Sequence, residues 1–440
     1  MKVVIVGGGT LGTTCAFELR KLNKDVDITI IEKGKHLQYS PCALPYLLSG
    51  EVKSLEDIFI FDKKDYITNG IDLNLETKVI DVDRDNKKVI TQSSGSFDYD
   101  YLVLGLGSSK KEVSIKGLSE NTLTYNNLND FYKFEDYIKN NNVKNISVIG
   151  SGLIGTELAF SLLKLGYNVN LIEAKDSILP NLIDHEISDK LKKYFINQGM
   201  NVYLDSTVKE VKSDKVILDD LKLKSDLTFN CTGLKPNTKL ADKIGLKVNE
   251  GIIVDKNLRT NDLNIFAGGD CIESKSKFLS SNEVSMLGTK AVRCAKVIAK
   301  NISGKDIELK PFLNSIVSKV GEKYVGSVGI NSEYAKKNGL DVYSASYTTG
   351  VVSEYYDCDD KITYNILCDS DSKIIGCQII SDVNVSGRIN TISIAIEREM
   401  TIDELSFVET CYNPGCAPIN DPMTITCEIL SKRLKFMLKK

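Results

Sequence analysis

The sequence predicts an α/β protein in which two similar βαβ units are followed by a C-terminal α+β portion. Residues 3–32 and 146–173 share one pattern: an apolar strand, a glycine-rich turn, and a helix that leads into a second apolar strand. The number of residues from Gly7 to Gly150 equals the number between the Ala-Phe pairs of the two helices, so the two copies align without an insertion from the turn to the helix. Such a repeat predicts two Rossmann-like dinucleotide-binding domains in one chain.

The remaining elements are expected from shorter signals. Short strands are expected between and after the two units, at residues 77–82, 87–91, 101–104, 201–204, 209–211, 216–218 and 227–231. From about Pro311 the pattern is typical of an α+β domain, with strands and helices at residues 315–320, 324–329, 362–368, 390–398 and 421–435. We therefore expect three domains, the first of them discontinuous, at residues 1–112 with 241–312, 113–240 and 313–440.

Composition excludes several classes of protein. The formal net charge is −3, so no basic surface indicates binding to nucleic acid. No apolar run approaches the roughly 18 residues of a membrane span, and the chain opens on a strand, so we expect neither membrane insertion nor a signal peptide. The 11 cysteines are scattered without a zinc-like pair, which favours the cytoplasm and no metal site.

Each βαβ unit carries a glycine triplet and a terminal acid. In Gly7-x-Gly9-x-x-Gly12 the glycines allow a tight turn, close approach to a pyrophosphate and close helix–strand packing. Glu32 ends the next strand, where its carboxylate can accept a hydrogen bond from a ribose hydroxyl. The second unit repeats the arrangement with the residues Gly150, Gly152, Gly155 and Glu173.

The residues after Glu173 bear on the choice of nicotinamide nucleotide. An acid at this position favours a free 2′-hydroxyl and repels a 2′-phosphate. Ala174 and Lys175 follow it, without an arginine pair. We therefore expect NADH rather than NADPH, although NADPH stays open because Lys175 could reverse the preference.

The segment from Thr260 to Asp270 ends in Ala-Gly-Gly-Asp, and with the two glycine turns it resembles the pyridine nucleotide–disulfide oxidoreductase family. The resemblance implies that the first unit binds FAD and that Asp270 bonds the flavin's ribityl chain. Residues 99–107 and 230–237 resemble the family's linking segments, with Gly105, Leu106 and Cys231 as small departures. The resemblance also adds Lys33, Gly107 and Gly233 to the cofactor-binding residues.

A single cysteine, Cys42, lies in the run Ser-Pro-Cys-Ala-Leu-Pro-Tyr after the first unit. Leu47 stands where glutathione-reductase-like members have a second cysteine, so the run resembles the coenzyme A–disulfide reductase and NADH oxidase branch. We expect Cys42 to begin a helix whose dipole lowers the thiol pKa, because the thiolate is the reactive form.

Other positions depart from the branch or are ambiguous. Thr10 replaces a histidine that is frequent in NADH peroxidases and oxidases, and Pro41 replaces an asparagine that is frequent in coenzyme A–disulfide reductases. Arg20 and Lys21 could meet a phosphorylated substrate, but solvated charges on a helix are at least as good an interpretation.

The C-terminal segment, residues 411–418, is similar to a family segment that enters the partner subunit's active site. Tyr412 keeps the first aromatic of that segment, and Cys416 replaces the second. A thiol at Cys416 could relay electrons to a bulky substrate. The alternative, which we favour slightly, is that Cys416 is a small buried side chain.

Together these features predict a homodimeric, cytoplasmic FAD protein in which NADH reduces the flavin and the flavin reduces Cys42. The thiolate would then cleave a small disulfide, persulfide or polysulfide. One alternative is an NADH oxidase in which Cys42 cycles through sulfenic acid while oxygen is reduced. Another is a redox-sensing flavoprotein with little turnover.

Overall fold

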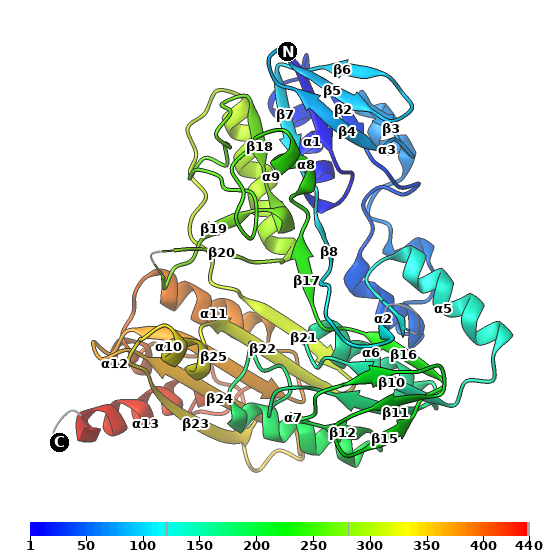
Figure 1. Cartoon of the computed structure of the whole chain (residues 1–440). Coiled ribbons are helices and arrows are strands. Elements are labelled where there is room, and N and C mark those ends of the chain that lie inside the picture. The colour runs from blue at the N-terminus through cyan, green and yellow to red at the C-terminus, as the bar shows by residue number, and fades with distance from the viewer. Residues whose placement is uncertain (119–121, 280, 438–440) are drawn as a thin grey trace. The chain divides into compact units, whose positions relative to one another are not determined.

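The computed structural model describes residues 1–118, 122–279 and 281–437, and the chain divides into two compact units (Figure 1). The first unit consists of Met1–Ala43, Val52–Glu112 and Gly233–Phe312. The second consists of Leu44–Glu51, Val113–Thr232 and Leu313–Lys440. The second βαβ unit therefore packs together with the C-terminal portion, and the three-domain division expected above stays a prediction.

A five-stranded parallel sheet forms the centre of the first unit. Its strand order is β18 (Ile265–Ala267), β7 (Tyr101–Leu104), β1 (Lys2–Val6), β2 (Asp27–Ile31) and β3 (Ile71–Asn74). The central strands β1 and β7 and the strand β18 are apolar runs, because helices and loops cover both faces of such a sheet. Helix α1 (Thr10–Leu22) packs along α9 (Gly288–Ile302), and both belong to the same hydrophobic core as the strands.

Smaller elements complete the first unit. A three-stranded antiparallel sheet contains β4 (Val79–Asp83), β5 (Lys88–Thr91) and β6 (Ser96–Asp98). Two further strand pairs are β8 (Ser108–Lys110) with β17 (Leu234–Pro236), and β19 (Glu273–Lys275) with β20 (Asn282–Val284). The short helices are η1 (Pro41–Ala43), η2 (Glu56–Ile58), α3 (Lys63–Thr68), α8 (Lys239–Lys243) and η3 (Gly269–Cys271).

The second unit repeats this architecture in its nucleotide-binding half. The parallel sheet has the order β12 (Asn201–Tyr203), β11 (Asn168–Ile172), β10 (Asn145–Ile149), β16 (Leu227–Asn230) and β9 (Thr122–Leu123). The small antiparallel sheet contains β13 (Glu210–Val211), β14 (Lys215–Ile217) and β15 (Lys222–Lys224). Its helices are α2 (Leu44–Leu48), α5 (Leu128–Asn140), α6 (Leu153–Lys164) and α7 (His185–Asn197), and α2 packs on α6.

The C-terminal half of this unit is built on an antiparallel sheet. Its order is β21 (Ile316–Val320), β22 (Lys323–Gly329), β25 (Ile374–Ser381), β24 (Lys361–Cys368) and β23 (Tyr343–Gly350). Its helices are α10 (Ser332–Lys337), α11 (Ser386–Glu397), α12 (Ile402–Ser406) and α13 (Pro422–Met437). Figure 1 shows α11 beside β22 and β25, and α13 beside β23.

The fold class predicted from the repeat is confirmed, with one feature that the repeat did not reveal. The two parallel sheets have the same order when the second is read from β9 to β12, so that β18 corresponds to β9 and β1 to β10. However, β18 comes from far downstream of β1 in the chain, whereas β9 precedes β10. Equivalent hydrogen bonds close the two turns, from Gly7 N to Ile31 O at 2.9 Å and from Gly150 N to Ile172 O at 2.8 Å. One topology is therefore completed by different parts of the chain.

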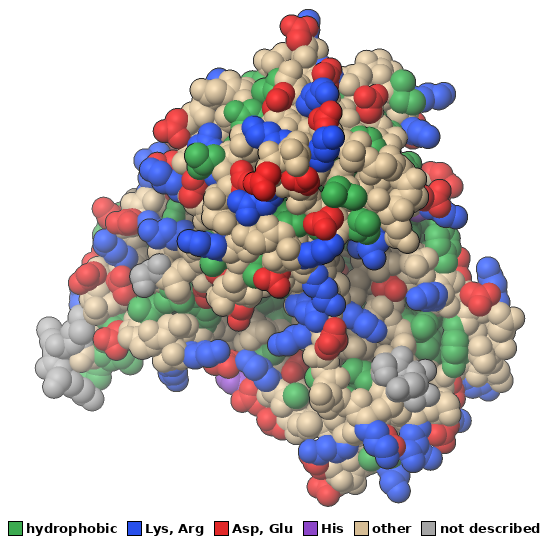
Figure 2. All heavy atoms as spheres, turned by 45° about the horizontal axis from the view of Figure 1, so that its top comes forward, with side chains coloured by type: hydrophobic (Ala, Val, Ile, Leu, Met, Phe, Trp, Pro, Cys, Tyr) green, Lys and Arg blue, Asp and Glu red, His purple; other side chains and the backbone are tan. Residues whose placement is uncertain are grey.

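The surface carries both signs of charge. On the face drawn in Figure 2, basic and acidic side chains are interspersed, as expected for a chain with a net charge of −3. Within the described residues, the helices are too short or too polar to cross a bilayer.

Candidate active site of a dinucleotide-dependent redox protein

The first glycine turn leaves open space at the start of α1. Gly7 has φ +108°, and a Cβ there would lie 2.2 Å from the carbonyl oxygen of Gly105. A Cβ at Gly12 would lie 1.9 Å from the carbonyl oxygen of Gly7, so these two positions need glycine for packing. At Gly9, by contrast, a Cβ would meet no atom within 4 Å, and no side chain caps the helix there. The exposed N–H groups of this 13-residue helix suit a phosphate.

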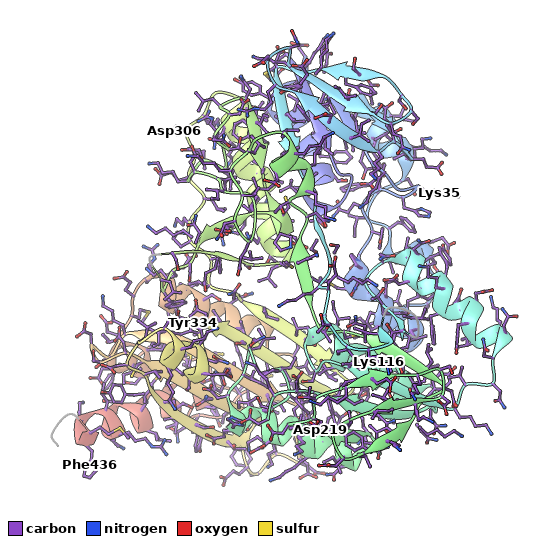
Figure 3. The ribbon with its side chains drawn as sticks, in the orientation of Figure 1. Lys35, Lys116, Asp219, Asp306, Tyr334 and Phe436 are labelled. Carbon is purple, nitrogen blue, oxygen red and sulfur yellow. The ribbon has the colours of Figure 1, made fainter. Side chains whose placement is uncertain are left out.

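The acid at the end of β2 is held by the backbone on both sides. Glu32 accepts hydrogen bonds from Gly8 N at 2.7 Å and from Gly34 N at 2.8 Å. Each carboxylate oxygen keeps a lone pair for a ribose hydroxyl. Lys33 beside it is exposed, as is Lys35, which projects from the loop after β2 (Figure 3).

A second polar group of the first unit lies at the end of β18. Asp270, in η3, accepts a hydrogen bond from Ser108 Oγ at 2.9 Å, and burial raises its pKa. Gly107, next to Ser108, has φ +65°. Lys290 of α9 is also buried, and burial lowers its pKa. The negative charge of Asp270 opposes this shift only in part. The open cradle at Gly9 and this partly buried carboxyl fit FAD, whose pyrophosphate would need an anion site and whose ribityl chain would need a polar partner.

The second glycine turn has the same geometry. Gly150 has φ +101°, and a Cβ there would lie 2.4 Å from the carbonyl oxygen of Cys231; a Cβ at Gly155 would lie 1.9 Å from that of Gly150. A Cβ at Gly152 would meet no atom within 4 Å, which leaves the start of α6 open in the same way. Gly233, which follows β16, has φ +116°. The turn fits a second dinucleotide.

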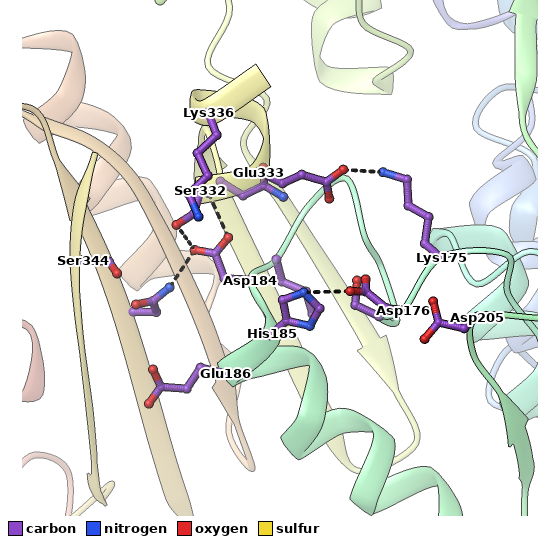
Figure 4. A pocket seen from close by; sticks show the side chains of 14 residues that line it. Lys175, Asp176, Asp184, His185, Glu186, Asp205, Ser332, Glu333, Lys336 and Ser344 are labelled. Atoms are coloured by element: carbon purple, nitrogen blue, oxygen red, sulfur yellow. Dashed lines mark hydrogen bonds and ion pairs between the residues drawn. The ribbon is translucent and has the colours of Figure 1, made fainter. Parts of the chain in front are cut away.

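Glu173 repeats the role of Glu32 with one more hydrogen bond. Its Oε2 accepts from Ser151 N at 2.8 Å and from Ser151 Oγ at 2.9 Å, and its Oε1 accepts from Lys175 N at 3.0 Å. The Lys175 ammonium group is 2.9 Å from Glu333 Oε1 (Figure 4). It is also 3.2 Å from Asn181 Oδ1. The cation that could have favoured NADPH is therefore already paired with a carboxylate.

The environment of Cys42 agrees with the expectation in part. Cys42 lies in the single turn η1, and its side chain is exposed. The helix that follows, α2, begins at Leu44 and has only 5 residues. Cys42 therefore lies in the first turn of a helical segment, as expected, but the segment is short and its dipole is correspondingly small. Its exposure is nonetheless what a thiol that attacks a small substrate needs.

Sequence reasoning missed a partly buried carboxyl group close to α2. Glu157, on α6, accepts a hydrogen bond from Ser318 Oγ at 2.6 Å and faces the Tyr46 hydroxyl of α2. Tyr46 itself donates to the carbonyl oxygen of Lys319 at 2.9 Å. Burial raises the pKa of Glu157 to about 7, against the effect of these hydrogen bonds. The available signal was an acid in an otherwise apolar helix, two residues after Gly155.

The two C-terminal candidates lie on an exposed loop of the second unit. The Tyr412 hydroxyl is 2.7 Å from that of Tyr355, and Cys416 N donates to Asn413 O at 2.9 Å. The Cys416 side chain is exposed in the single chain, and its role stays a prediction. The loop packs against Tyr356, whose ring would be 3.1 Å from a Cβ at Gly415.

The two basic residues of α1 have local partners. Arg20 donates to the carbonyl oxygens of Asn69 at 2.7 Å and Gly70 at 2.8 Å, and also to that of Lys24. Lys21 forms an ion pair with Glu18 at 2.9 Å. These contacts favour the structural interpretation of Arg20 over a phosphate-binding one.

Comparison with known proteins identifies the family. The sequence model of pyridine nucleotide-disulphide oxidoreductases matches residues 1–295, and the model of their dimerisation domain matches residues 319–418. An NADH oxidase of Methanocaldococcus jannaschii is 33% identical over 445 residues, 99% of each chain. The chain belongs to the pyridine nucleotide–disulphide oxidoreductase family. It is therefore an enzyme, an NAD(P)H-dependent flavoprotein oxidoreductase, as the sequence predicted.

Two further relatives are similar over nearly the whole chain. An NAD(P)H coenzyme A polysulfide/persulfide reductase of Pyrococcus horikoshii is 27% identical, and the match covers 98% of each chain. The solved structure of an NAD-dependent persulfide reductase from A. fulgidus has a TM-score of 0.95 at 29% identity, over 99% of this chain and 84% of that one. Oxidases and sulfur reductases thus share this family fold.

Proposed function

We propose that the enzyme uses NADH to reduce a small disulfide, persulfide or polysulfide at Cys42. The observation that carries this proposal is the exposed Cys42 thiol on the turn after the first nucleotide-binding unit, with no further cysteine between residues 43 and 230 and with Cys15 buried in α1. An internal dithiol near Cys42 is thus unavailable, and the second sulfur of the exchange comes from the substrate. The polysulfide/persulfide reductase of P. horikoshii supports this choice of acceptor.

The chemistry needs one exchange and one two-electron reduction. The Cys42 thiolate attacks one sulfur of R–S–S–R′, a Cys42–S–S–R mixed disulfide forms, and R′–S⁻ leaves with the electron pair. Two electrons that come from NADH then cleave the mixed disulfide, which releases R–S⁻ and restores the Cys42 thiolate. When bound, FAD supplies the two-electron relay between nicotinamide and sulfur.

We propose separate binding residues for the two cofactors. FAD is bound by the first unit, through the residues Gly7, Gly9, Gly12, Glu32, Lys33, Gly107 and Asp270. NADH is bound by the second turn, through Gly150, Gly152, Gly155, Glu173 and Gly233. The open starts of α1 and α6 and the backbone-held acids support this assignment.

We propose a cytoplasmic homodimer in which the loop of Tyr412 and Cys416 completes the partner's site. The dimerisation-domain match to residues 319–418 includes both residues. Apolar side chains near this loop are exposed in the single chain, Phe407 by 90% and Ile419 by 71%. Burial against a second copy would remove this apolar area from water.

An anaerobic acceptor screen tests the proposal. Purified enzyme should oxidise NADH with polysulfide, a persulfide or coenzyme A disulfide, and the Cys42→Ser variant should lose this turnover. Turnover with oxygen alone, and with none of the sulfur acceptors, would overturn the proposal. The same screen tests the second candidate, an NADH oxidase, which the 33% identical M. jannaschii relative favours.

A further inference from the structure

The residue that pairs with Lys175 comes from the C-terminal half of the second unit. Glu333 is the second residue of α10, next to Tyr334 (Figure 3), and its Oε1 is 2.9 Å from Lys175 Nζ. The backbone of Lys175 is also held, because its N–H donates a hydrogen bond to Glu173 Oε1 at 3.0 Å. The contact therefore connects α10 with the acid that we assign to the adenosine ribose.

Lys175 is the only cation in the turn that follows Glu173, residues 174–177. A ribose 2′-phosphate would need a cation in this turn, because Glu173 itself repels it. With its ammonium group turned to Glu333 and Asn181, Lys175 offers no net positive charge to such a phosphate. Besides the repulsion by Glu173, the pairing removes the one cation of this turn that could favour NADPH.

The pocket beside this contact is acidic. It has a volume of about 600 Å³ and lies between the β11 turn, the start of α7, and α10 (Figure 4). The ionisable side chains that line it are Asp176, Asp184, Glu186, Asp205, Glu333, Lys175, Lys336 and His185. Asp184 is engaged by Ser332 and Asn365, and Asp176 lies 3.3 Å from His185. The remaining acids add to the repulsion of a phosphate.

We propose that Glu333 is a specificity-determining residue that keeps the enzyme selective for NADH by neutralising Lys175. The inference rests on the proposed function, in which the nucleotide binds at the second glycine turn. According to this proposal, the choice between NADH and NADPH depends on α10 of the C-terminal half as well as on the glycine turn and Glu173. Removing Glu333 both releases a positive charge and deletes a negative one at the ribose end.

The contact can be removed without unfolding the protein. The side chains of Lys175 and Glu333 are 42% and 59% exposed, and such surface pairs contribute little to stability. Glu333→Gln should therefore fold normally. We expect its kcat/KM for NADPH to rise on the order of tenfold, since a released charge acts over a few ångströms near the surface. Its kcat/KM for NADH should change by less than about twofold.

Two matched variants separate the pairing from net charge. Glu186→Gln removes one charge from the same pocket but does not touch Lys175, so its NADPH/NADH ratio should stay near that of the native enzyme. In the double variant Lys175→Gln/Glu333→Gln, the gain for NADPH should disappear, because the released cation is missing. Equal gains in Glu333→Gln and Glu186→Gln would overturn the proposal in favour of a general field effect.

A binding measurement without turnover completes the test. Calorimetric titration of the full chain with adenosine 2′,5′-bisphosphate and with 5′-AMP reports the 2′-phosphate directly. Glu333→Gln should bind the bisphosphate more tightly and 5′-AMP unchanged. Unchanged binding of both ligands, with NADH still the donor, would overturn this inference and leave the proposed function intact. If native enzyme prefers NADPH, or NADH gives no turnover with any acceptor, the proposed function fails instead.

Discussion

The Ser318 hydroxyl donates a 2.6 Å hydrogen bond to the Glu157 carboxyl group, which joins β21 to α6 inside the second unit. The Tyr46 hydroxyl faces the same carboxyl group and gives its one proton to the Lys319 carbonyl oxygen. Polar contacts with Ser318 and Tyr46 favour the ionised carboxylate, but burial outweighs them and raises the pKa of Glu157 to about 7. The protonated form of Glu157 is therefore accessible at neutral pH.

The raised pKa predicts that stability falls as the pH rises. The folded state binds the Glu157 proton more tightly than the unfolded state, whose carboxyl titrates near 4.5. This contribution is complete below pH 4.5 and is lost as the pH rises through about 7, in total roughly 3 kcal/mol. Glu157→Gln should remove it. The check is urea unfolding of both proteins between about pH 5 and 8.5.

Glu51 provides a control, because its pKa is shifted in the opposite direction to that of Glu157. Burial alone would raise its pKa, but hydrogen bonds from Lys319 and Lys164 outweigh it and lower the value. Its contribution to stability is present at neutral pH and is lost as the pH falls through the lowered pKa. Glu51→Gln should therefore matter most at neutral and higher pH. A pH profile for Glu157→Gln that parallels the native profile would refute the assignment of the titrating group to Glu157.

Cys42→Ser should separate nucleotide oxidation from sulfur chemistry. The glycine turns and their acids do not include Cys42, so we expect the variant to bind FAD and to be reduced by NADH at a rate close to native. Turnover with polysulfide should fall by a factor on the order of 10³ or more, because a serine hydroxyl does not exchange with disulfides. Stopped-flow reduction and steady-state assays measure the two steps. Cys411→Ser, which also changes an exposed thiol, is the control.

Sequence reasoning succeeded where the chemistry demands a fixed local pattern. The glycines at positions 7, 12, 150 and 155 are required by approaches of about 2 Å that any Cβ would make to a carbonyl oxygen. Glu32 and Glu173 follow their strands by fixed offsets, so their positions could be predicted. Strands β23 and β25 were not predicted, although the α+β character of the region was.

The missed residues owe their roles to partners distant in the sequence. Glu157 meets Tyr46 and Ser318, and Lys175 meets Glu333, 158 residues away. No local spacing encodes such pairs. The helix expected at Cys42 is present but begins with a 3₁₀ turn, η1, that leads directly into α2, and Pro45 suits the first turn of that short helix. The relation between Cys42 and the Tyr412 loop stays a prediction.

The two glycine cradles can be tested with a pair of alanine variants. A Cβ at Gly9 meets no protein atom, so Gly9→Ala should keep the fold and lose FAD affinity, since the methyl group occupies the space assigned to the pyrophosphate. Gly12→Ala forces a 1.9 Å contact with the Gly7 carbonyl oxygen and should destabilise the whole unit. Flavin content after gel filtration and thermal unfolding distinguish the two effects. Full flavin occupancy in Gly9→Ala would count against the FAD assignment.

The resting oxidised enzyme should carry a small thiol on Cys42. Residues 43–51 contain no cysteine, so a disulfide with a neighbour in the next turn cannot form. An exposed thiol that accepts sulfur from small disulfides should then remain as a mixed disulfide with one of them. Intact mass under non-reducing conditions should show an adduct that reduction removes and that Cys42→Ser lacks. A covalent dimer of twice the chain mass, lost in either Cys42→Ser or Cys416→Ser, would instead make Cys416 a redox partner across the dimer.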